Sequence, residues 1–511
     1  MKLTARGEPF DFTNLFILEM ANNHGGSVKH GLRIIEECAQ VVKDHGVRAA
    51  MKFQFRDLDT FVHPAERKGS TNKHVARFLS TRLSKKDFKI LVDAARKAGF
   101  ITMATPSDEA SVDLLEELNV DMVKIASASA ADWPLLEKAV ALGKPIVVSV
   151  GGMTLAQVDK LVSFLGHRYS NFAIMHCVSV YPTPASRLNL KHIEVFRNSY
   201  PGVSVGFSTH EDPNNTSAIG IAYAKGARVF ERHVGIPTKD KPLNAYSSTP
   251  QQLDAWIRAW EEARAMEGTA ERETDPKEIN ELAMQQRGVF AKRALKKGAV
   301  IKRGDIYFAF PIRFGQLSSG DFRESKVSAE KAYKKDDPVS RAARDFKPTN
   351  RDLIYHPIHE VKAMLNVAKV ALPVDFKLQF LHHYGLKDFR EVGAIAIDCI
   401  DREYRKRVLV QLPGQEYPLH HHTKSEISYD VLFGTLDLEI DGRRQTLHAG
   451  DVVTIQRGVK HRFWNDTGAI FEEISLPRTD DEIVYEDRLI GRRPEKERMT
   501  TLTNWGRHQF D

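Results

Sequence analysis

The stretch PLHHHTKSE, residues 418–426, places three histidines and a glutamate within seven positions. His420 and His422 are two residues apart, so on a β-strand they would point to one face, with His421 on the other. Imidazoles and carboxylates are ligands that divalent transition metals take in proteins. The stretch therefore predicts either a metal site or a polar pocket without a metal.

A second set of polar residues stands at the ends of β-rich runs in the first half of the chain. If these runs are the parallel strands of a (β/α)8 barrel, their carboxyl ends open on one mouth, where such barrels gather catalytic groups. Because every one of the runs contributes a residue, we interpret the mouth as a catalytic site. The residues expected there are Glu19, Asn23, Lys52, Gln54, Thr105, Lys124, Ser127, Ser129, Ser149, His176, Ser179, Ser208, His210, Glu231 and His233.

The residue types at this mouth suggest a reaction class. Two lysines, several hydroxyls and the pair Gly151–Gly152 form a cradle suited to phosphate and carboxylate groups. His210 and His233 follow adjacent strands and can hold a divalent metal while leaving positions open for a substrate. Glu19 is a candidate general base. The expected chemistry is binding of an anionic phosphate ester, polarisation of an oxygen and movement of a proton.

The elements that must position these groups alternate regularly. Eight β-rich runs are separated by amphipathic helical stretches, as a (β/α)8 barrel of roughly 250 residues requires. In SVKHGLRIIEECAQVVKDHG apolar residues recur at helical spacing, and Gly46 can end the helix. A doubly wound open sheet is the alternative, but EMANNHGGS after the first run lacks its G-x-G-x-x-G fingerprint. The runs are residues 14–20, 47–55, 99–105, 120–127, 145–150, 171–178, 203–208 and 227–234.

Composition limits the protein to a few broad classes. A hydrophobic content of 42% and a charged content of 28% are those of a soluble globular protein. No apolar run approaches the roughly 18 residues of a membrane span, and MKLTARGEPFDF lacks the apolar segment of a signal peptide. Three scattered cysteines fit a reducing compartment, so we expect a cytoplasmic protein. A net charge of +7 without interleaved aromatic residues does not predict a nucleic-acid binder.

The chain of 511 residues is too long for one ordinary core, and its patterns change along the sequence. We expect a barrel domain, a charged helical linker, a small β-rich module, a second linker region, a β-barrel or sandwich rich in Gly and Asp turns, and a charged tail. Their expected bounds are 1–265, 266–287, 288–345, 346–389, 390–490 and 491–511.

Several segments of the first half resemble one known family. The motifs FILEMANNHGGS, AAMKFQ, MATPSD, VKIASAS, VSVGGM, MHCVSVYPTP, VGFSTH and ERHVG resemble the N-acetylneuraminate (sialic acid) synthase family, in family order over about residues 1–345. The resemblance implies a TIM barrel followed by a small antifreeze-like (SAF) domain. It also implies condensation of phosphoenolpyruvate with a sugar aldehyde, giving a 2-keto-3-deoxy sugar acid and phosphate, with Mn2+ or a similar ion.

The resemblance also implies roles for single residues. Phosphoenolpyruvate would be held by Lys52, Lys124, Ser127, Ser149 and Ser208, while His210 and His233 would ligate the metal. Glu19 would do proton chemistry, Tyr181 would line the mouth, and Arg313 in FPIRFGQ is the counterpart of a SAF arginine that reaches the partner subunit's mouth in a homodimer. Asn23, Gln54, Thr105 and Ser179 complete the expected substrate-binding set.

Three positions depart from the family pattern on the side that faces the sugar acceptor. Ser129 stands where the family has a glutamate, Asn244 stands where it has an aspartate, and Ser-Val replaces the asparagine before YPTP. The resemblance therefore implies phosphoenolpyruvate as one substrate but an acceptor other than N-acetylmannosamine.

The second half resembles the cupins. GQEYPLHHHTKSE and GDVVTIQRGVKHRFWN are similar to the two cupin motifs. The resemblance implies a β-barrel whose metal ligands are His420, His422, Glu426 and His461, for Mn, Fe, Ni or Zn. REYRKRVLVQLPGQ before the histidines also resembles cupin sugar isomerases of the lyxose type.

Three functions follow from these observations. The first is a metal-dependent, carbon–carbon bond-forming synthase, with the main chemistry in the barrel. The second is a metal-dependent sugar isomerase or epimerase that works through the cupin, or a bifunctional combination of both. The third is a catalytically silent carbohydrate-binding protein, against which the presence of Glu19, Lys52, Lys124, His210 and His233 argues.

Overall fold

The computed structural model describes residues 9–168, 171–269, 274–323, 327–343, 350–477, 482–507 and 509. The chain divides between residues 273 and 274 into two compact units. No helix of the described residues is long and apolar enough to cross a membrane.

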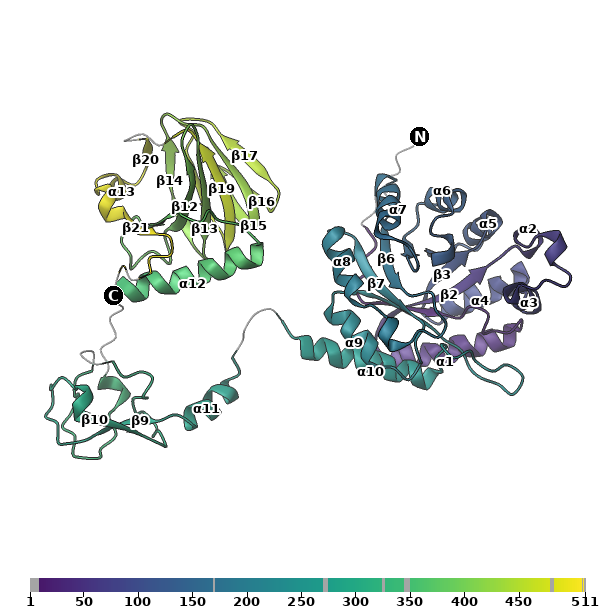
Figure 1. Ribbon diagram of the computed structural model, residues 1–511, viewed down its shortest axis with the longest axis horizontal. Coiled ribbons are helices and arrows are strands. Elements are labelled where there is room, and N and C mark those ends of the chain that lie inside the picture. Colours follow the sequence, from purple (N-terminus) through teal and green to yellow (C-terminus); the bar gives the residue numbers. More distant parts are fainter. Residues whose placement is uncertain are drawn as a thin grey trace. The chain divides into compact units, whose positions relative to one another are not determined.

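The first unit is a closed barrel of eight parallel strands in sequence order, surrounded by helices (Figure 1). The predicted (β/α)8 barrel is thereby confirmed. The strands are β1 Leu15–Glu19, β2 Arg48–Phe55, β3 Ile101–Pro106, β4 Met122–Ile125, β5 Ile146–Ser149, β6 Phe172–Cys177, β7 Ser204–Thr209 and β8 Val229–His233. The outer helices are α1 Val28–His45, α4 Lys85–Lys97, α5 Glu109–Glu117, α6 Trp133–Ala141, α7 Leu155–His167, α8 Lys191–Ser199, α9 Ser217–Ala224 and α10 Pro250–Glu267.

Local signals in the sequence start and end these helices. The side chain of Ser27 accepts a hydrogen bond from the His30 amide and caps α1, which ends at Gly46 in the left-handed conformation, as predicted. Thr154 and Gln157 form a reciprocal capping box at the start of α7.

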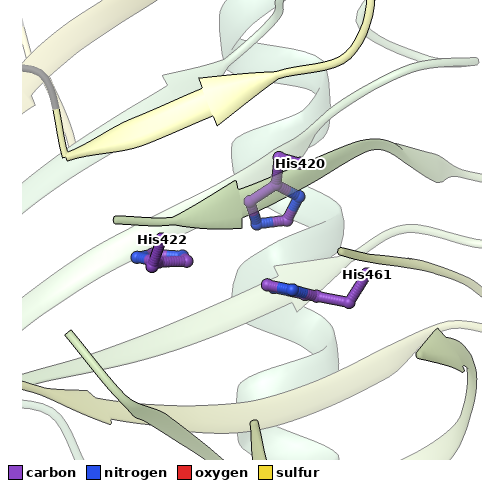
Figure 2. Close-up of side chains that lie close together, drawn as sticks. All are labelled: His420, His422 and His461. Carbon is purple, nitrogen blue, oxygen red and sulfur yellow. The ribbon is translucent and has the colours of Figure 1, made fainter. Parts of the chain in front are cut away.

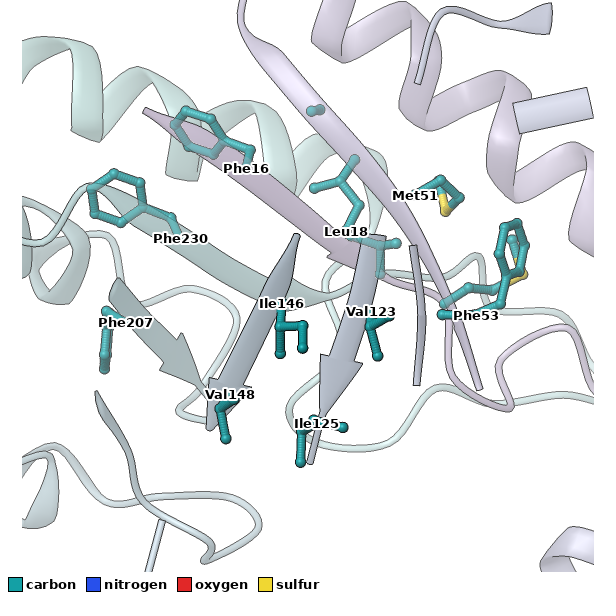
Figure 3. Packing of buried hydrophobic residues seen from close by; sticks show 14 of the residues in the cluster. Phe16, Leu18, Met51, Phe53, Val123, Ile125, Ile146, Val148, Phe207 and Phe230 are labelled. Atoms are coloured by element: carbon teal, nitrogen blue, oxygen red, sulfur yellow. The ribbon is translucent and has the colours of Figure 1, made fainter. Parts of the chain in front are cut away.

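Alternation along each strand separates packing residues from site residues. On β1, Phe16 and Leu18 belong to the core shared with the helices, whereas Leu15 and Ile17 belong to a separate cluster of strand residues inside the barrel. Figure 3 shows members of the outer set, among them Phe16, Met51 and Phe230. Because strand side chains alternate with a period of two, the inward series of β1 ends at Glu19 at the carboxyl end.

The connection between β2 and α4 is longer than the others and carries its own small elements. They are α2 Leu58–Phe61, the 3₁₀ turn η1 Pro64–Glu66 and α3 Lys73–Ser80. Figure 1 shows α2 and α3 at the edge of the barrel beside β2. We refer to residues 56–84 as the β2–α4 excursion.

The second unit begins with a helix and a small module. Helix α11 Pro276–Met284 lies in the stretch expected to be a helical linker. After it, β9 Gly288–Ala291 and β10 Ile306–Ala309 pair antiparallel, and isolated bridges tie the remaining described backbone together. Twelve buried side chains, including Val289, Ile301 and Tyr333, form the core of this module, which spans residues 288–343 of the described chain.

A curled antiparallel sheet forms the rest of the second unit, as the cupin motifs predict. Its path runs β20-β14-β18-β15-β19-β13-β12-β11-β21, with β16 and β17 paired to β15. The strands are β11 Lys377–Leu381, β12 Ala394–Asp401, β13 Arg405–Gln411, β14 Glu416–His422, β15 Ile427–Ile440, β16 Arg443–His448, β17 Val452–Ile455, β18 His461–Trp464, β19 Ala469–Ser475, β20 Ile483–Tyr485 and β21 Met499–Thr503; the helices are α12 Asn350–Ala368, α13 Arg488–Gly491 and α14 Glu495–Arg498.

Two of the expected boundaries are wrong. Residues 346–389 are not a linker where the structure describes them, since α12 packs Ile354, Ile358 and Val361 on the sheet and β11 pairs with β12. Residues 491–511 are not only a tail, because β21 pairs with β11 along its whole length. The apolar stripe of α12, spaced at i, i+4, i+7, gives this segment one face that packs on the sheet.

Candidate active site

A cavity of about 930 Å3 opens at the carboxyl ends of the barrel strands. That volume lies in the range of sites for small molecules and has room for two of them. Most of the predicted residues meet there. The cavity is lined by Glu19, Lys52, Gln54, Thr105, Lys124, Ser127, Ser149, Ser179, Tyr181, Ser208, His210, His233 and Asn244.

Buried charges at the floor of this cavity are paired in a row. Lys52 Nζ lies 2.7 Å from Glu19 Oε2 and 2.5 Å from Glu231 Oε1, and Lys124 Nζ lies 2.9 Å from Glu231 Oε2. Lys124 also donates a 2.5 Å hydrogen bond to Ser149. Two ammonium groups and two carboxylates thus neutralise one another, which is what keeps four charged groups stable away from water.

The two lysines differ in how strongly they are held in the charged form. Burial favours the neutral amine of Lys52, but Glu19 and Glu231 outweigh burial and raise its pKa. Lys124 has only Glu231 as an ion-pair partner among the described residues, and burial lowers its pKa. Burial opposes the charge of Glu231 as well, but Lys124 and Lys52 hold its pKa well below the usual range. An additional anion would therefore be stabilised most at Lys124.

Ser149 contacts Lys124, and further hydroxyl and amide groups line the same cavity. The Gly151 amide donates a 2.9 Å hydrogen bond to Ser127 Oγ. A Cβ atom at Gly151 would lie 2.5 Å from Ser179 Oγ and 2.9 Å from Ser127 Oγ, so only glycine fits this approach. The close-packed hydroxyls and the backbone amide suit a phosphate or carboxylate.

Glu19 is anchored on both oxygens. Its Oε1 accepts a 2.6 Å hydrogen bond from the Ala21 amide, and its Oε2 accepts one of 3.0 Å from Gln54 besides pairing with Lys52. This arrangement fixes the carboxylate in place, so that Glu19 is positioned to hold Lys52 and Gln54.

His210 and His233 form the predicted pair. Their ring centroids are 5.3 Å apart, and Tyr181 and Tyr246 pack against them at 4.3 Å and 5.1 Å. Burial lowers the pKa of both rings to about 3, so both are neutral near pH 7. His233 Nδ1 is buried without a hydrogen-bond partner in the described chain. Two neutral imidazoles with an unused nitrogen fit a divalent cation that keeps positions open for substrate.

Three residues predicted for the mouth, Asn23, His176 and Ser129, do not line this cavity. Asn23 donates to the Val234 carbonyl at 2.8 Å and to Ser247 Oγ at 3.1 Å, and its neighbour Asn22 lines the cavity instead. His176 has the outward parity of β6, stacks on Phe207 and bonds to the Leu188 carbonyl. Ser129 is not among the lining residues, and the exposed Arg313 belongs to the second unit.

Other lining residues were missing from the predicted site set. Glu231, which was expected at the mouth but was given no individual role, shares the inward parity of His233 and joins the two lysines. Asn22 and Tyr246 come from loops, while Arg56, Lys73, His74, Arg77 and Phe78 come from the β2–α4 excursion, which has no periodic pattern that ties it to a strand end.

The cupin sheet holds a second histidine cluster. His420 and His422 on β14 and His461 on β18 offer ligand atoms that all lie within 4.8 Å of one another, and all three side chains are buried (Figure 2). His420 Nδ1 and His461 Nδ1 lie 2.9 Å and 3.0 Å from the Pro418 and Val459 carbonyls. These contacts favour tautomers that carry the proton on Nδ1 and the lone pair on Nε2, the atom that would ligate an ion; His461 Nε2 also lies 3.4 Å from the Tyr429 hydroxyl.

Glu426 does not join this cluster, which corrects the predicted ligand set. It is exposed, because it precedes Ile427, the first core-facing residue of β15. The buried carboxylates here are Glu473, which is paired with Arg407, and Glu482, whose Oε1 lies 3.7 Å from His422 Nδ1.

The pocket beside these histidines is very small. Its volume is about 10 Å3, room for one ion or one water molecule. It is lined by Arg407, Leu409, Tyr417, His420, His422, Tyr429, Phe463, Glu473 and Ile483. The pocket that His420 and His422 line is therefore too small for a sugar, against the expectation of open positions for sugar hydroxyls.

Comparison with known proteins agrees with this architecture. Residues 39–272 match the NeuB family and residues 408–475 match the cupin domain. A crystal structure of spore coat polysaccharide biosynthesis protein E from Chromobacterium violaceum is similar with a TM-score of 0.61 and 40% identity, over 65% of this chain and 100% of that one.

Two curated relatives are similar at lower identity. N,N'-diacetyllegionaminic acid synthase of Legionella pneumophila is 28% identical over 58% of this chain and 86% of its own length. N-acetylneuraminate-9-phosphate synthase of Drosophila melanogaster is 31% identical over 48% of this chain and 66% of its own length. With the barrel, its paired lysines and the cupin sheet in place, these similarities show that the chain belongs to the NeuB family and carries a C-terminal cupin domain.

Proposed function

We propose that the barrel condenses phosphoenolpyruvate with an aldose-type sugar and releases a 2-keto-3-deoxy, sialic-acid-like sugar acid and phosphate. The observation that carries this proposal is that the lysine–carboxylate row, the hydroxyl cradle and the neutral histidine pair all line one cavity. An anionic phosphate ester needs the first two features, and an aldehyde that must be polarised needs the third.

Phosphoenolpyruvate would bind at the Lys124 end of the row. Lys124 is the lysine with a single carboxylate partner, and Ser127, Ser149 and Ser208 stand around it. Lys52, held in its charged form by two carboxylates, would face the substrate carboxylate. These groups are fixed by hydrogen bonds before substrate arrives, so little reorganisation is needed during the reaction.

The bonds and protons of the reaction balance with one water molecule. The vinyl carbon of phosphoenolpyruvate attacks the aldehyde carbon, a carbon–carbon bond forms, and the aldehyde oxygen takes up a proton to become a hydroxyl. Water adds to the resulting cationic carbon and loses a proton; the carbon–oxygen bond to phosphate then breaks, the new hydroxyl passes its proton to the departing phosphate, and a keto group is left. The role of Glu19 in this proton movement remains the prediction made from the sequence.

The barrel histidines have the chemistry of a metal site. A divalent ion such as Mn2+ held by His210 and His233 would supply a Lewis acid for the aldehyde oxygen. Among the described residues these two rings offer the only histidine pair in the cavity, and Glu19 and Glu231 are engaged by lysines. Open positions would therefore be left for substrate oxygens.

The acceptor sugar would lie toward Tyr181, Tyr246 and Asn244. The amide nitrogen of Asn244 is buried without a hydrogen-bond partner in the described chain, so it can donate to a sugar oxygen. An amide also accepts hydrogen bonds but carries no charge, unlike the aspartate expected from family resemblance. This difference supports an acceptor distinct from N-acetylmannosamine.

The direct test is phosphate release that requires both substrates. A panel of aldoses is supplied with phosphoenolpyruvate and Mn2+, and free phosphate is measured. His210→Ala and His233→Ala should each lower release by roughly a thousandfold while the melting curve stays native, because loss of a metal ligand disables the Lewis acid. Exposed His63→Ala is the matched control. Normal release by both mouth variants would refute the metal assignment, and release without an aldose would refute condensation.

For the cupin we propose a bound divalent ion with a structural role. The cluster of three buried imidazoles, two of which line a pocket of about 10 Å3, supports an enclosed ion rather than the sugar isomerase alternative. Elemental analysis of the full-length protein should give about two ions per chain for wild type and one for His420→Ala or for His210→Ala. One ion in wild type, lost only in His210→Ala, would mean that the cupin holds none.

We also propose a homodimer in the cytoplasm. The exposed Arg313 in the 288–343 module is available for the mouth of a partner subunit, as the family resemblance implies. The described cysteines Cys38, Cys177 and Cys399 are all free thiols, which fits a reducing compartment. Light scattering at micromolar concentration should give twice the mass of 57.7 kDa. A monomer under those conditions would refute the exchange of modules.

A further inference from the structure

The β2–α4 excursion brings two arginines to the cavity that the proposed reaction does not yet use. Arg56 follows β2 directly, and Arg77 lies on α3; both side chains line the cavity and both are partly buried. The guanidinium of Arg56 stacks on the Phe78 ring at 4.1 Å, which fixes its plane. Arg56, Arg77 and Phe78 thus form part of the cavity wall.

Neither arginine has a carboxylate partner. Among the described residues no carboxylate lies close enough to Arg56 or Arg77 to form an ion pair, for which the limit is about 4 Å. Asp59, in the same excursion, pairs with Arg82 instead. The hydrogen bond recorded for the Arg56 side chain runs to the neutral Gln54 Oε1 at 2.6 Å. Burial is the main cause that lowers the pKa of Arg56; the charges of Glu19 and Asp108 oppose this effect, and the charge of Arg77 adds to it. Like charges set together at a partly buried wall are stabilised by a bound anion.

The two lysines of the cavity differ from the arginines, because protein carboxylates pair with the lysines. Lys52 and Lys124 are in direct ion pairs with Glu19 and Glu231, whereas no direct ion pair is made by Arg56 or Arg77 among the described residues. Arginine, with a planar set of donors, suits the paired oxygens of phosphate and carboxylate groups.

The position of the arginines separates them from the phosphoenolpyruvate cradle. Hydrogen bonds and ion pairs connect the cavity floor in one order, with Arg56 at one end and Ser149 at the other. The order is Arg56, Gln54, Glu19, Lys52, Glu231, Lys124 and Ser149. An anion at the arginine end therefore lies across the row from an anion at the Lys124 end.

We propose that Arg56 and Arg77 form a second anion subsite, which binds a phosphate or carboxylate group carried by the acceptor sugar. The substrate class of the acceptor is then an acidic or phosphorylated aldose rather than a neutral one. This inference rests on the proposed condensation, with phosphoenolpyruvate at the Lys124 end. The volume of about 930 Å3 holds both molecules, and the acceptor bridges from the arginine wall to the histidine pair.

The test uses acceptor analogues that cannot react. Mannitol 1-phosphate, gluconate and mannitol lack an aldehyde, so calorimetry of each on the full-length protein at saturating phosphoenolpyruvate measures binding alone. Mannitol 1-phosphate, gluconate or both should bind wild type at least about tenfold more tightly than mannitol, and Arg77→Gln and Arg56→Gln should each remove about tenfold of that affinity. The stronger of the two anions identifies the acidic group.

Matched variants separate this effect from charge and folding. Lys68→Gln removes one positive charge from the same excursion at an exposed position outside the cavity, and should leave every affinity unchanged. Arg77→Lys should retain part of the binding, since it keeps the charge but not the paired donors. Melting curves are recorded for each variant, and Arg56→Gln serves if Arg77→Gln does not fold.

Three results would overturn the proposal. The first is equal binding of the acidic and neutral alditols to wild type. The second is an equal loss in Lys68→Gln and Arg77→Gln. The third is weaker phosphoenolpyruvate binding in Arg77→Gln with unchanged alditol affinities, which would assign the arginines to phosphoenolpyruvate. Failure of the proposed condensation would be seen separately, as phosphate release that never requires an aldose. In that case an alditol phosphate could bind through the Lys124 cradle, and its affinity would fall in Lys124→Gln rather than in Arg77→Gln.

Discussion

The barrel mouth and the cupin pocket both contain neutral, buried histidines, yet they differ in free volume and in the charges around them. Burial lowers the pKa of His210 to about 3 and that of His461 to about 4. The mouth adds four paired charges and a cavity of about 930 Å3, whereas the cupin pocket has about 10 Å3. Residue type and neutral imidazole state therefore do not distinguish a reaction site from an enclosed ion site; free volume and neighbouring charges do.

The charged floor offers the strongest way to test this difference. Glu231→Gln leaves Lys52 paired with Glu19 and leaves Lys124 buried without a carboxylate partner among the described residues. Because burial already lowers the pKa of Lys124, Lys124 should then lose its proton more readily. We expect phosphate release to fall by roughly a thousandfold and the free energy of unfolding to fall by about 3 kcal/mol. Phosphate release and urea denaturation measure the two effects.

The exposed Glu116→Gln, on α5, is the control for Glu231→Gln and should change neither quantity. If Glu231→Gln kept full activity, the lysine–carboxylate row would be a packing feature rather than part of the site, and the contrast with the cupin would lose its basis.

The corresponding ion pair of the cupin should affect stability alone. Arg407 and Glu473 are buried and paired beside the histidines, and Arg407, despite burial, has a raised pKa because of Glu473. Glu473→Gln leaves that guanidinium uncompensated and should cost about 3 kcal/mol locally. Hydrogen exchange followed by mass spectrometry should show faster exchange in β13 and β19 peptides and unchanged barrel peptides.

Replacing both partners, as Arg407→Met with Glu473→Leu, should recover most of the lost protection, because no charge then remains buried. Failure of the double variant to recover would indicate that the pair does more than satisfy its own charges.

The sequence was sufficient to predict which residues point into the barrel and which histidines of the cupin lie together. Glu19, Lys52 and Lys124 follow from strands whose alternation is regular, because parity and strand direction fix where a side chain ends. His420 and His422 follow in the same way from their two-residue spacing. Both deductions use only local periodicity, which a single sequence contains.

Other features depend on contacts between distant segments. The contacts of Glu231 with two lysines can be predicted only when the barrel interior is known. The pairing of β11 with β21 brings together Lys377 and Thr503, which are far apart in the sequence. Glu426 was assigned by motif spacing, but it lies in a turn whose direction that spacing does not fix. Arg56 and Arg77 lie in or beside an excursion without a period, so nothing local indicates that they reach the cavity.

Access of a chelator should differ between the two proposed ions. The barrel mouth is a cavity of about 930 Å3 with room for a chelator. The three cupin histidines are buried, and the pocket that His420 and His422 line has a volume of only about 10 Å3. With EDTA we expect activity to disappear at least about tenfold faster than the second ion leaves, since the latter requires local opening of the sheet. Elemental analysis of samples taken over time gives both rates. Equal rates would mean that the cupin pocket is not closed in solution.

The smallest expected effect lies outside both sites, at His45, which links α1 to α10. Its ring nitrogens lie 2.9 Å from Asp254 and 3.0 Å from Glu261; burial lowers the pKa of His45, but these hydrogen bonds outweigh burial and raise it. A pKa raised on folding adds stability below the unfolded value of about 6.5, and this stability is lost as pH rises through the folded pKa. His45→Gln should therefore cost about 0.5–1 kcal/mol at about pH 5.5 and less at about pH 8.5, because both carboxylate partners are half-exposed. Urea denaturation at the two pH values measures the difference. A larger cost of His45→Gln at high pH would show that the ring contributes by packing. A comparable pH dependence of stability in Glu231→Gln would show that the charges of the barrel floor titrate between the same two pH values.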